Sequence, residues 1–212
     1  MTPKKIEKDT ELKILEAAKR IFVLKGLDGA RMQEIADEAG INKALLHYYF
    51  RSKDQLFMMV FKVEVGKFFP SLLPILKSKE LNNEEKIRQI VELYINLFLS
   101  NPFLPVFIIR EINRNPQDIV MYFKEAAVNI DIIRQEMVEF ALDFGYKPDE
   151  AMHLIVNIVS MCIFPFAGRP IIENILFNSN SSEFSQFLNN RKQYVADFII
   201  NSLRGKLLSN KE

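Results

Sequence analysis

Apolar residues recur every three or four positions along almost the whole chain, and no segment shows the strict alternation of a half-buried strand. Ile14, Ala18, Ile21 and Phe22 fall on one side of a helix predicted over residues 10–25, and Gly26 just beyond it is a typical helix stop. Helical spacing continues toward the C-terminus between polar, proline or glycine breaks. The pattern therefore predicts an all-α fold of about nine helices.

Two short helices are predicted next, over about residues 32–39 and 42–49, with Gly40 between them. Glycine can adopt the left-handed backbone conformation that lets one helix end and the next leave at a steep angle, and Asn42 can cap the second helix. The segment 52–55, Ser-Lys-Asp-Gln, has the form of a capping box and predicts a long fourth helix that runs to Pro70 or beyond. A supporting helix followed by two short helices and a tight turn is a helix-turn-helix.

Similar signals divide the rest of the chain. They predict a fifth helix from Asn82, a short sixth after Pro102, a long seventh from Asn115 to Gly145, an eighth from Pro148 to about Phe164, and a ninth to about Leu208. The stretch between the eighth and ninth helices, residues 168–180, is predicted to be irregular, and residues 179–183 are predicted to form a loop.

The outward face of the third predicted helix suits a DNA groove. Helical geometry places Lys43, Ala44, His47 and Tyr48 on one face and turns Leu45, Leu46 and Tyr49 to the other. Lysine can donate to guanine or to phosphate, alanine permits close approach, and histidine and tyrosine add donors. The same pattern also arises by chance in all-α proteins, where a glycine and an asparagine simply end one helix and cap the next.

Composition limits the remaining classes of function. The one cysteine, Cys162, cannot form an intramolecular disulfide and is expected to be a buried, inert thiol in a reducing compartment. A polar start without a signal peptide, and no long uninterrupted apolar run, predict a cytoplasmic protein with no membrane span. His47 and His153 lie far apart, and the familiar catalytic and phosphate-binding motifs are absent, so we expect no enzyme, no metal and no cofactor. The small basic excess before Lys53 alone would not establish a nucleic-acid partner.

A resemblance adds to this interpretation. Residues 10–57, with ILEAAKRIFVLKG, IADEAGINKALLHYYF and SKDQLF, closely resemble the N-terminal domain of TetR/AcrR-family transcriptional repressors. The resemblance implies DNA contacts from the start of the second helix and the whole of the third, which correspond here to Arg31, Gln33, Asn42, Lys43, Ala44, Leu45, His47, Tyr48 and Tyr49, with Lys53 on phosphate.

Some positions leave alternatives open. Leu45 and Tyr49 are contested, because periodicity alone turns both inward. Ala30-Arg31 stands where the family usually has a Thr/Ser pair, so the second helix has a weak side-chain cap. Arg31 either replaces the hydroxyl contact to phosphate with a charged one or is a solvated surface residue.

The rest of the chain is rich in phenylalanine, methionine and isoleucine, which can build a large core and a plastic apolar cavity. The resemblance implies that this part binds a small apolar or amphipathic effector, for which we select Phe103, Phe107, Met121, Tyr122, Met137, His153 and Asn157 as candidate lining residues. With Ser160, the last two share one helical face that serves either as ligand donors or as a polar seam at a subunit contact. Arg110, Glu111 and Arg114 are interpreted as a partly solvated face rather than a ligand clamp.

The last predicted helix carries more apolar residues than simple docking requires. Its candidate dimer contacts are Phe184, Phe187, Leu188, Tyr194, Val195, Phe198 and Ile199. A dimer is expected because two-fold DNA readers need paired half-sites, and in the family the last two helices of two subunits form a four-helix bundle. The alternative is a terminal helix that packs only within its own subunit.

Together these features predict a helix-turn-helix DNA-binding domain over residues 1–53 and a helical effector-binding and dimerisation domain over residues 54–212. The expected function is that of a dimeric DNA-binding transcriptional regulator, a repressor that a small effector releases from a palindromic operator. The alternative is a helical protein-interaction module that does not use DNA.

Overall fold

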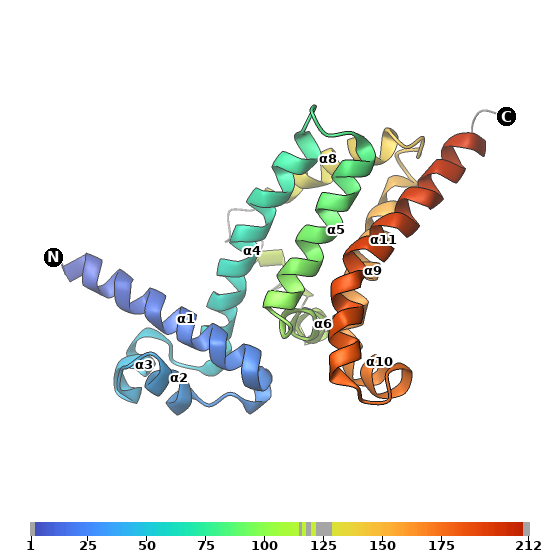
Figure 1. Cartoon of the computed structure of the whole chain (residues 1–212). Helices are drawn as coiled ribbons and strands as arrows, with labels where there is room; N and C mark the ends of the chain where they lie inside the picture. Colours follow the sequence, from blue (N-terminus) through green and yellow to red (C-terminus); the bar gives the residue numbers. More distant parts are fainter. Residues whose placement is uncertain (1–2, 115, 118–119, 122–128, 210–212) are drawn as a thin grey trace.

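The computed structural model describes residues 3–114, 116, 117, 120, 121 and 129–209. Within these residues there are ten helices and no strand, which confirms the all-α prediction. Three helices form a small group at one end of the molecule: α1 (Pro3–Gly29), α2 (Met32–Glu38) and α3 (Lys43–Tyr49). Figure 1 shows the N-terminus in this group and the C-terminus at the opposite end.

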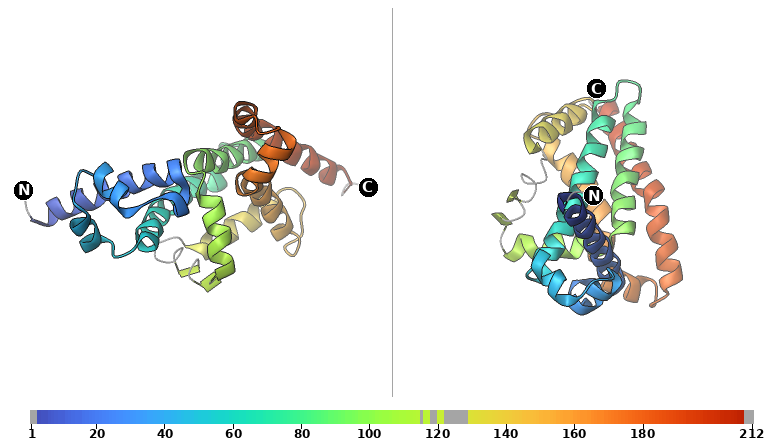
Figure 2. Two further views of the ribbon diagram at one scale, coloured as in Figure 1. Left: turned by 90° about the horizontal axis from the view of Figure 1, so that it is seen from below. Right: turned by 90° about the vertical axis from the view of Figure 1, so that its left-hand side faces the viewer.

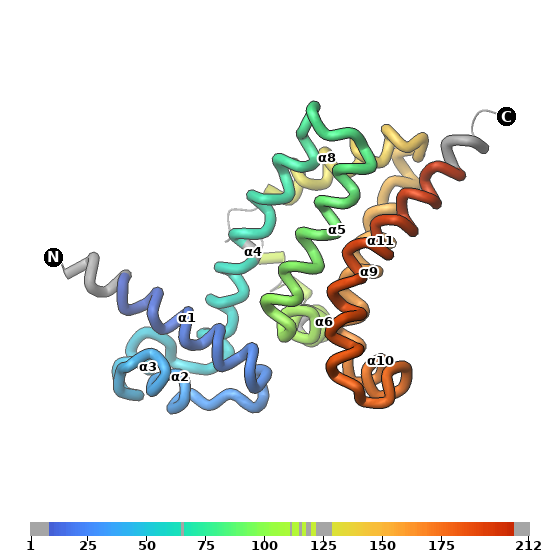
Figure 3. Tube along the Cα trace, viewed as in Figure 1, coloured from blue at the N-terminus to red at the C-terminus, as the bar shows by residue number. Residues whose placement is uncertain are grey.

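The other helices form the body of the molecule. They are α4 (Lys53–Lys77), α5 (Asn83–Ser100), α6 (Leu104–Arg114), α8 (Ile130–Leu142), α9 (Ala151–Ala167), α10 (Arg169–Leu176) and α11 (Ser181–Ser209). The trace in Figure 3 shows α4 rising from the end of α3, past α1, into the body, where it packs against α5 and α8. The α4 helix therefore belongs to both parts of the molecule. No single helix among the described residues has both the length and the apolar character needed to cross a membrane.

The turn signals of the N-terminal part act as predicted. Gly26 breaks α1 with φ 68° and ψ 176°, and Gly40 has φ 68° between α2 and α3. The Asn42 side-chain oxygen accepts a hydrogen bond from the backbone N of Leu45 at 2.8 Å, and Ser52 Oγ accepts from that of Gln55 at 3.1 Å. These caps satisfy N–H groups that a helix start leaves without partners.

Three predictions for the later helices are wrong, and one of them is the loop over residues 179–183, because α11 already starts at Ser181. A single long helix from Asn115 to Gly145 does not form, because Asn129 has a non-helical backbone and its Oδ1 accepts from the N of Ile132 at 3.0 Å, so α8 starts there. Parts of the predicted seventh helix lie outside the described residues. The segment 168–180 is not irregular throughout, since α10 occupies most of it; Pro170 is tolerated there because it lies in the first helical turn.

Aromatic packing joins the small N-terminal group to the body. The rings of Phe22 on α1 and Phe57 on α4 lie 4.8 Å apart, and Phe57 lies 5.2 Å from Phe103 and 4.2 Å from Phe107 of α6. Phe22 and Phe57 are fully buried. Cys162 is buried as predicted, and burial raises the pKa of its thiol to about 12, which leaves it in the unreactive protonated form.

A buried carboxylate on α4 also joins α1 to the body. Glu64 is only 6% exposed; its carboxylate accepts from Lys19 Nζ of α1 at 2.9 Å, from Lys67 Nζ at 3.1 Å, and from Asn101 Nδ2 at the end of α5 at 3.1 Å. Burial by itself raises the pKa of Glu64, but the hydrogen bonds and charges of Lys19 and Lys67 outweigh it, so the pKa lies below its usual value.

We expect Glu64→Gln to lower the free energy of unfolding by about 1–2 kcal/mol at pH 7, because the amide keeps the shape and loses both charged hydrogen bonds. The pKa of Glu64 is lower in the folded protein than in the unfolded chain, where it is 4.5. Ionised Glu64 therefore stabilises the fold above pH 4.5, and this stabilisation is lost as the pH falls through the pKa of the folded state. The difference between wild type and variant, measured by urea unfolding from pH 7 to pH 3, should therefore shrink below about pH 4.5. Glu92→Gln, at an exposed position on α5, is the control. A pH-independent difference would contradict this account.

Candidate nucleic-acid interface

Ion pairs and buried apolar residues fix the position of α2 and α3. Arg20 Nε of α1 lies 2.7 Å from Glu38 Oε1 of α2, and Lys25 Nζ lies 2.8 Å from Glu34 Oε1. The hydrogen bond from Lys25, with its charge, lowers the pKa of Glu34. On α3, Leu46 is fully buried and anchors the short helix against the core.

The outer face of α3 carries the residues that helical periodicity placed there. Lys43, Ala44, His47 and Tyr48 are all exposed, and the exposed fraction of Tyr48 reaches 75%. They lie on a helix that starts directly after the Asn42 cap, at the edge of the molecule (Figure 1). This surface offers an ammonium, a small methyl group, an imidazole and a phenol to a partner.

The two contested residues differ from each other. Leu45 is 36% exposed and reaches the surface, whereas Tyr49 is half-buried and packs against the core. The rings of Tyr48 and Tyr49 lie 5.5 Å apart and perpendicular, so the half-buried ring of Tyr49 supports the exposed ring of Tyr48. Periodicity alone was thus right about the inward turn of Tyr49 and incomplete for Leu45.

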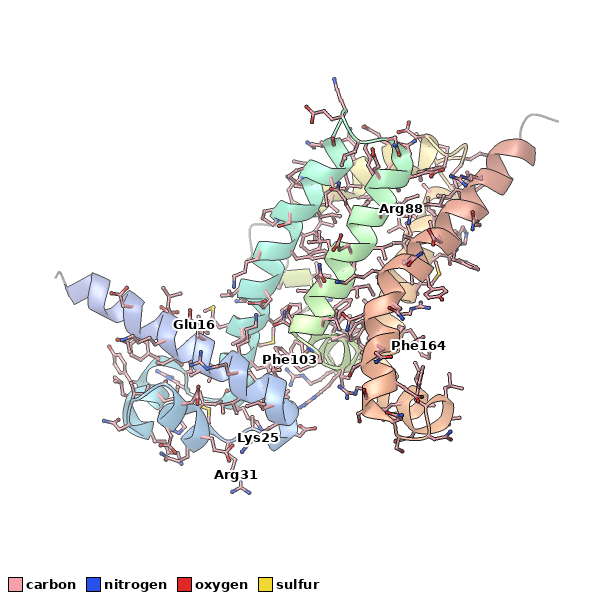
Figure 4. All side chains as sticks on the ribbon, viewed as in Figure 1. Glu16, Lys25, Arg31, Arg88, Phe103 and Phe164 are labelled. Carbon is pink, nitrogen blue, oxygen red and sulfur yellow. The ribbon has the colours of Figure 1, made fainter. Side chains whose placement is uncertain are left out.

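The start of α2 shows the weak cap that its sequence predicts. Arg31 is the N-cap residue, and its guanidinium cannot accept a hydrogen bond from the helix. Glu34 Oε2 instead accepts from the backbone N of Arg31 at 3.3 Å. Arg31 is exposed and extends away from the body (Figure 4). Gln33 is also exposed, and its Nε2 donates to Asp37 Oδ1 at 2.8 Å.

Lys53 is half-buried and has structural partners of its own. Its Nζ donates to the carbonyl oxygen of Asp28 at 3.2 Å and to that of Ala30 at 3.0 Å. An ammonium has three N–H donors, so these two bonds leave one for another acceptor. The start of α4 is thereby tied to the segment between α1 and α2, a connection that sequence spacing did not reveal.

Comparisons with known proteins agree with this geometry. Residues 14–59, from α1 to the first turns of α4, match the family model of bacterial regulatory proteins of the tetR family. The HTH-type transcriptional regulator YuxN of Bacillus subtilis is 24% identical over 231 aligned residues, which cover 95% of this chain and 79% of YuxN. The N-terminal part of the chain, residues 14–59, therefore belongs to the tetR family of bacterial regulatory proteins.

Two further comparisons bear on fold and on regulation. The HTH-type transcriptional activator FasR of Mycolicibacterium smegmatis is 32% identical over 83 residues, 39% of this chain and 37% of FasR. A crystal structure of a regulator from Mesorhizobium loti, assigned to the TetR family, superposes with a TM-score of 0.57 over 92% of this chain and 96% of that one, at 20% identity. This last similarity shows a shared fold across both parts of the molecule.

The residues selected for an effector pocket do not line one cavity. Phe103 and Phe107 line a cavity between α1 and α6, Asn157 lines another between α9 and α11, and Met121 lies in a third. His153 is exposed on α9, and Met137 of α8 packs against the core. Tyr122 lies outside the described residues.

The residues selected for dimer contacts divide into two groups. Phe184, Leu188, Val195 and Ile199 of α11 are buried within the subunit, and Phe187 is half-buried. Tyr194 and Phe198 are 70% and 66% exposed. The adjacent helix α9 exposes apolar residues that the sequence interpretation missed, among them Val156 at 60% and Phe164 at 65%. Their spacing of eight residues, close to two helical turns, is a signal that could have found them.

Proposed function

We propose that the chain is a homodimeric regulator that reads a palindromic operator through α3 and is released from it by a small amphipathic effector. The observation that carries the proposal is the exposed α3 face, in which Lys43, His47 and Tyr48 surround the small Ala44 while Leu46 holds the helix from behind. In a helix-turn-helix the second short helix lies in the major groove with its first residues toward the base edges.

Each side chain of the proposed interface has a task that suits its chemistry. Lys43, in the first turn, donates to guanine O6 or N7, and Ala44 lets the helix approach a thymine methyl group. His47 and Tyr48 donate to base edges or phosphate from the next turn. Arg31, Gln33, Asn42 and Lys53 flank the helix and position it on the backbone, and Leu45 and Tyr49 complete the contact.

The proposed dimer face consists of α9 and α11. Val156 and Phe164 of α9 and Tyr194 and Phe198 of α11 are large, mostly exposed apolar side chains on two helices that pack against each other. Figure 2 shows this pair of helices at the opposite end of the molecule from α2 and α3. A second copy related by a two-fold axis would cover these side chains, with Asn157 and Ser160 as a polar seam, and would leave both DNA-binding parts free.

The effector would release the operator by shifting the population between two conformations of the dimer. We place the boundary between the DNA-binding domain, residues 1–53, and the effector-binding and dimerisation domain, residues 54–212, at the start of α4. Because α4 extends from this boundary into the body, an effector that prefers another placement of α4 would change the spacing of the two α3 helices. We propose that the chain represses transcription. Because FasR is an activator, the direction of the effect needs its own test, which is reporter transcription with and without the chain.

Selection of bound fragments from random duplex DNA tests the proposal. The expected result is a palindromic site whose half-sites lie about one helical turn, or a multiple of it, apart. Binding should weaken steeply with salt because phosphate contacts release counterions. If the purified chain retained no duplex DNA even at low salt, the proposal would fail and the protein-interaction alternative would replace it.

A further inference from the structure

A cavity of about 390 Å³ lies where the end of α1 meets α6 and the junction of α9 and α10. Its walls are strongly apolar and include Phe22, Phe103, Phe107 and Phe166, each no more than 8% exposed. Figure 4 shows Phe103 between the lower part of α1 and the body. The volume lies in the range of small-molecule sites, which are mainly apolar with a few placed polar groups.

The rim of this α1–α6 cavity is cationic. Lys25 of α1, Arg110 of α6 and Arg169 of α10 line it, and each side chain is 45% exposed. Among the lining residues the one acid is Asp28, whose side chain is 96% exposed. An apolar chamber with a cationic rim is complementary to a ligand that has an apolar tail and one anionic end.

Arg110 is the rim cation that is held most loosely. Its Nη1 lies 3.4 Å from Asp28 Oδ1, whereas Lys25 and Arg169 make contacts of 2.8 Å and 2.7 Å with Glu34 and Glu173. An exposed pair at that distance contributes little stability. A carboxylate that arrives with its tail in the cavity can therefore take Arg110 from Asp28 and form a bidentate contact with it.

We propose that the α1–α6 cavity binds a small amphipathic carboxylate, with its tail among the phenylalanines and its carboxylate on Arg110 and Arg169. The proposal rests on the function proposed above, since it names the ligand class and the site of the effector. It also reassigns Arg110, which sequence analysis placed on a solvated face.

The position of the cavity connects this ligand to the DNA-binding part. Asp28 lies two residues after Gly26, where the backbone changes direction, and its carbonyl oxygen accepts from Lys53 Nζ at the start of α4. Ala30, which accepts from the same ammonium, directly precedes the N-cap of α2. A ligand that replaces Asp28 at Arg110 removes an ion pair between α6 and this segment, so it acts directly on the connection between α1 and α2.

Isothermal titration with decanoate, in the absence of DNA, tests the site. Val106→Trp places a large side chain at the mouth from a residue that is 52% exposed, so the core is undisturbed, and binding should be lost. Arg110→Gln should weaken binding about tenfold, the effect of one charge-assisted hydrogen bond. Asp28→Asn removes the competing carboxylate and should strengthen decanoate binding severalfold. Arg88→Gln, high on α5 in Figure 4 and paired with Asp197, is the control and should bind as wild type does.

Uncharged decan-1-ol has the same tail and should bind at least about tenfold more weakly than decanoate. The site is overturned if decanoate does not bind, if decan-1-ol binds equally well, or if Val106→Trp binds as wild type does. Because the titration contains no DNA, the two proposals fail separately. If the chain binds DNA but not decanoate, only the proposed cavity site is overturned. If it binds decanoate but not DNA, only the proposed DNA-binding function is overturned.

Discussion

Lys43→Ala is expected to weaken binding to the selected operator by at least about thirtyfold. A lysine that donates to a base edge contributes about 1–3 kcal/mol of discrimination, and a symmetric dimer presents it twice, so the loss is about 2 kcal/mol or more. The side chain is exposed in the first turn of α3, so its removal should leave the fold intact. Fluorescence anisotropy with labelled operator at one fixed salt concentration measures the change.

A matched lysine separates base reading from general charge. Lys79→Ala removes the same charge from the exposed loop between α4 and α5, at the far end of the body from α3, and should change affinity less than twofold. Binding to a scrambled duplex adds a second criterion, because loss of a phosphate contact weakens all sequences alike, whereas loss of a base contact weakens the operator most. Equal losses on both duplexes would assign Lys43 to phosphate.

The helix-turn-helix could be predicted from the sequence because its signals are local. Gly40 needs only its own backbone conformation, and Asn42 and Ser52 cap helices whose first N–H groups lie three residues away. The spacing of Leu46 relative to Lys43 and His47 decides which side faces the core, whatever that core contains. Such features can be predicted without knowledge of the rest of the fold.

The wrong predictions for the later helices concern residues whose local structure is decided by the rest of the fold. The single long helix predicted from Asn115 to Gly145 makes Asn129 an interior helix residue, although its side chain can either lie on a helix surface or cap a new helix, and only the path of the chain selects between them. The irregular segment predicted over residues 168–180 does not take into account that Pro170 is tolerated in the first turn of a helix. Both residues permit two local structures.

The candidate site beyond α3 depends on contacts between distant segments. Arg110 and Asp28 are 82 residues apart, and Phe22 and Phe166 come from opposite parts of the chain, so no spacing rule brings them to one cavity. Likewise α11 is apolar on more than one side. Periodicity marks Val195 and Phe198 alike, yet Val195 is 1% exposed because α5 and α9 cover it, whereas Phe198 is 66% exposed.

Phe198→Asp is expected to convert the proposed dimer into a folded monomer. Phe198 lines the cavity between α9 and α11 together with Asn157 and Ser160, at the centre of the proposed face. Loss of a central aromatic contact costs about 2 kcal/mol, and two-fold symmetry applies it twice, so the dimer dissociation constant should rise nearly a thousandfold. Sedimentation velocity at micromolar concentration measures the association state.

The matched control for that experiment is Leu24→Asp on α1, which changes an apolar side chain that is 76% exposed and belongs to neither α9 nor α11. It introduces the same charge and should leave the dimer intact. The circular dichroism of Phe198→Asp should match that of wild type, because the replaced side chain is already mostly in solvent. Since an isolated monomer reaches only one half-site, Phe198→Asp should also lose most operator affinity with α3 unaltered. A variant that sediments as the wild type does, or a wild type that is itself monomeric, would show that α9 and α11 do not pair.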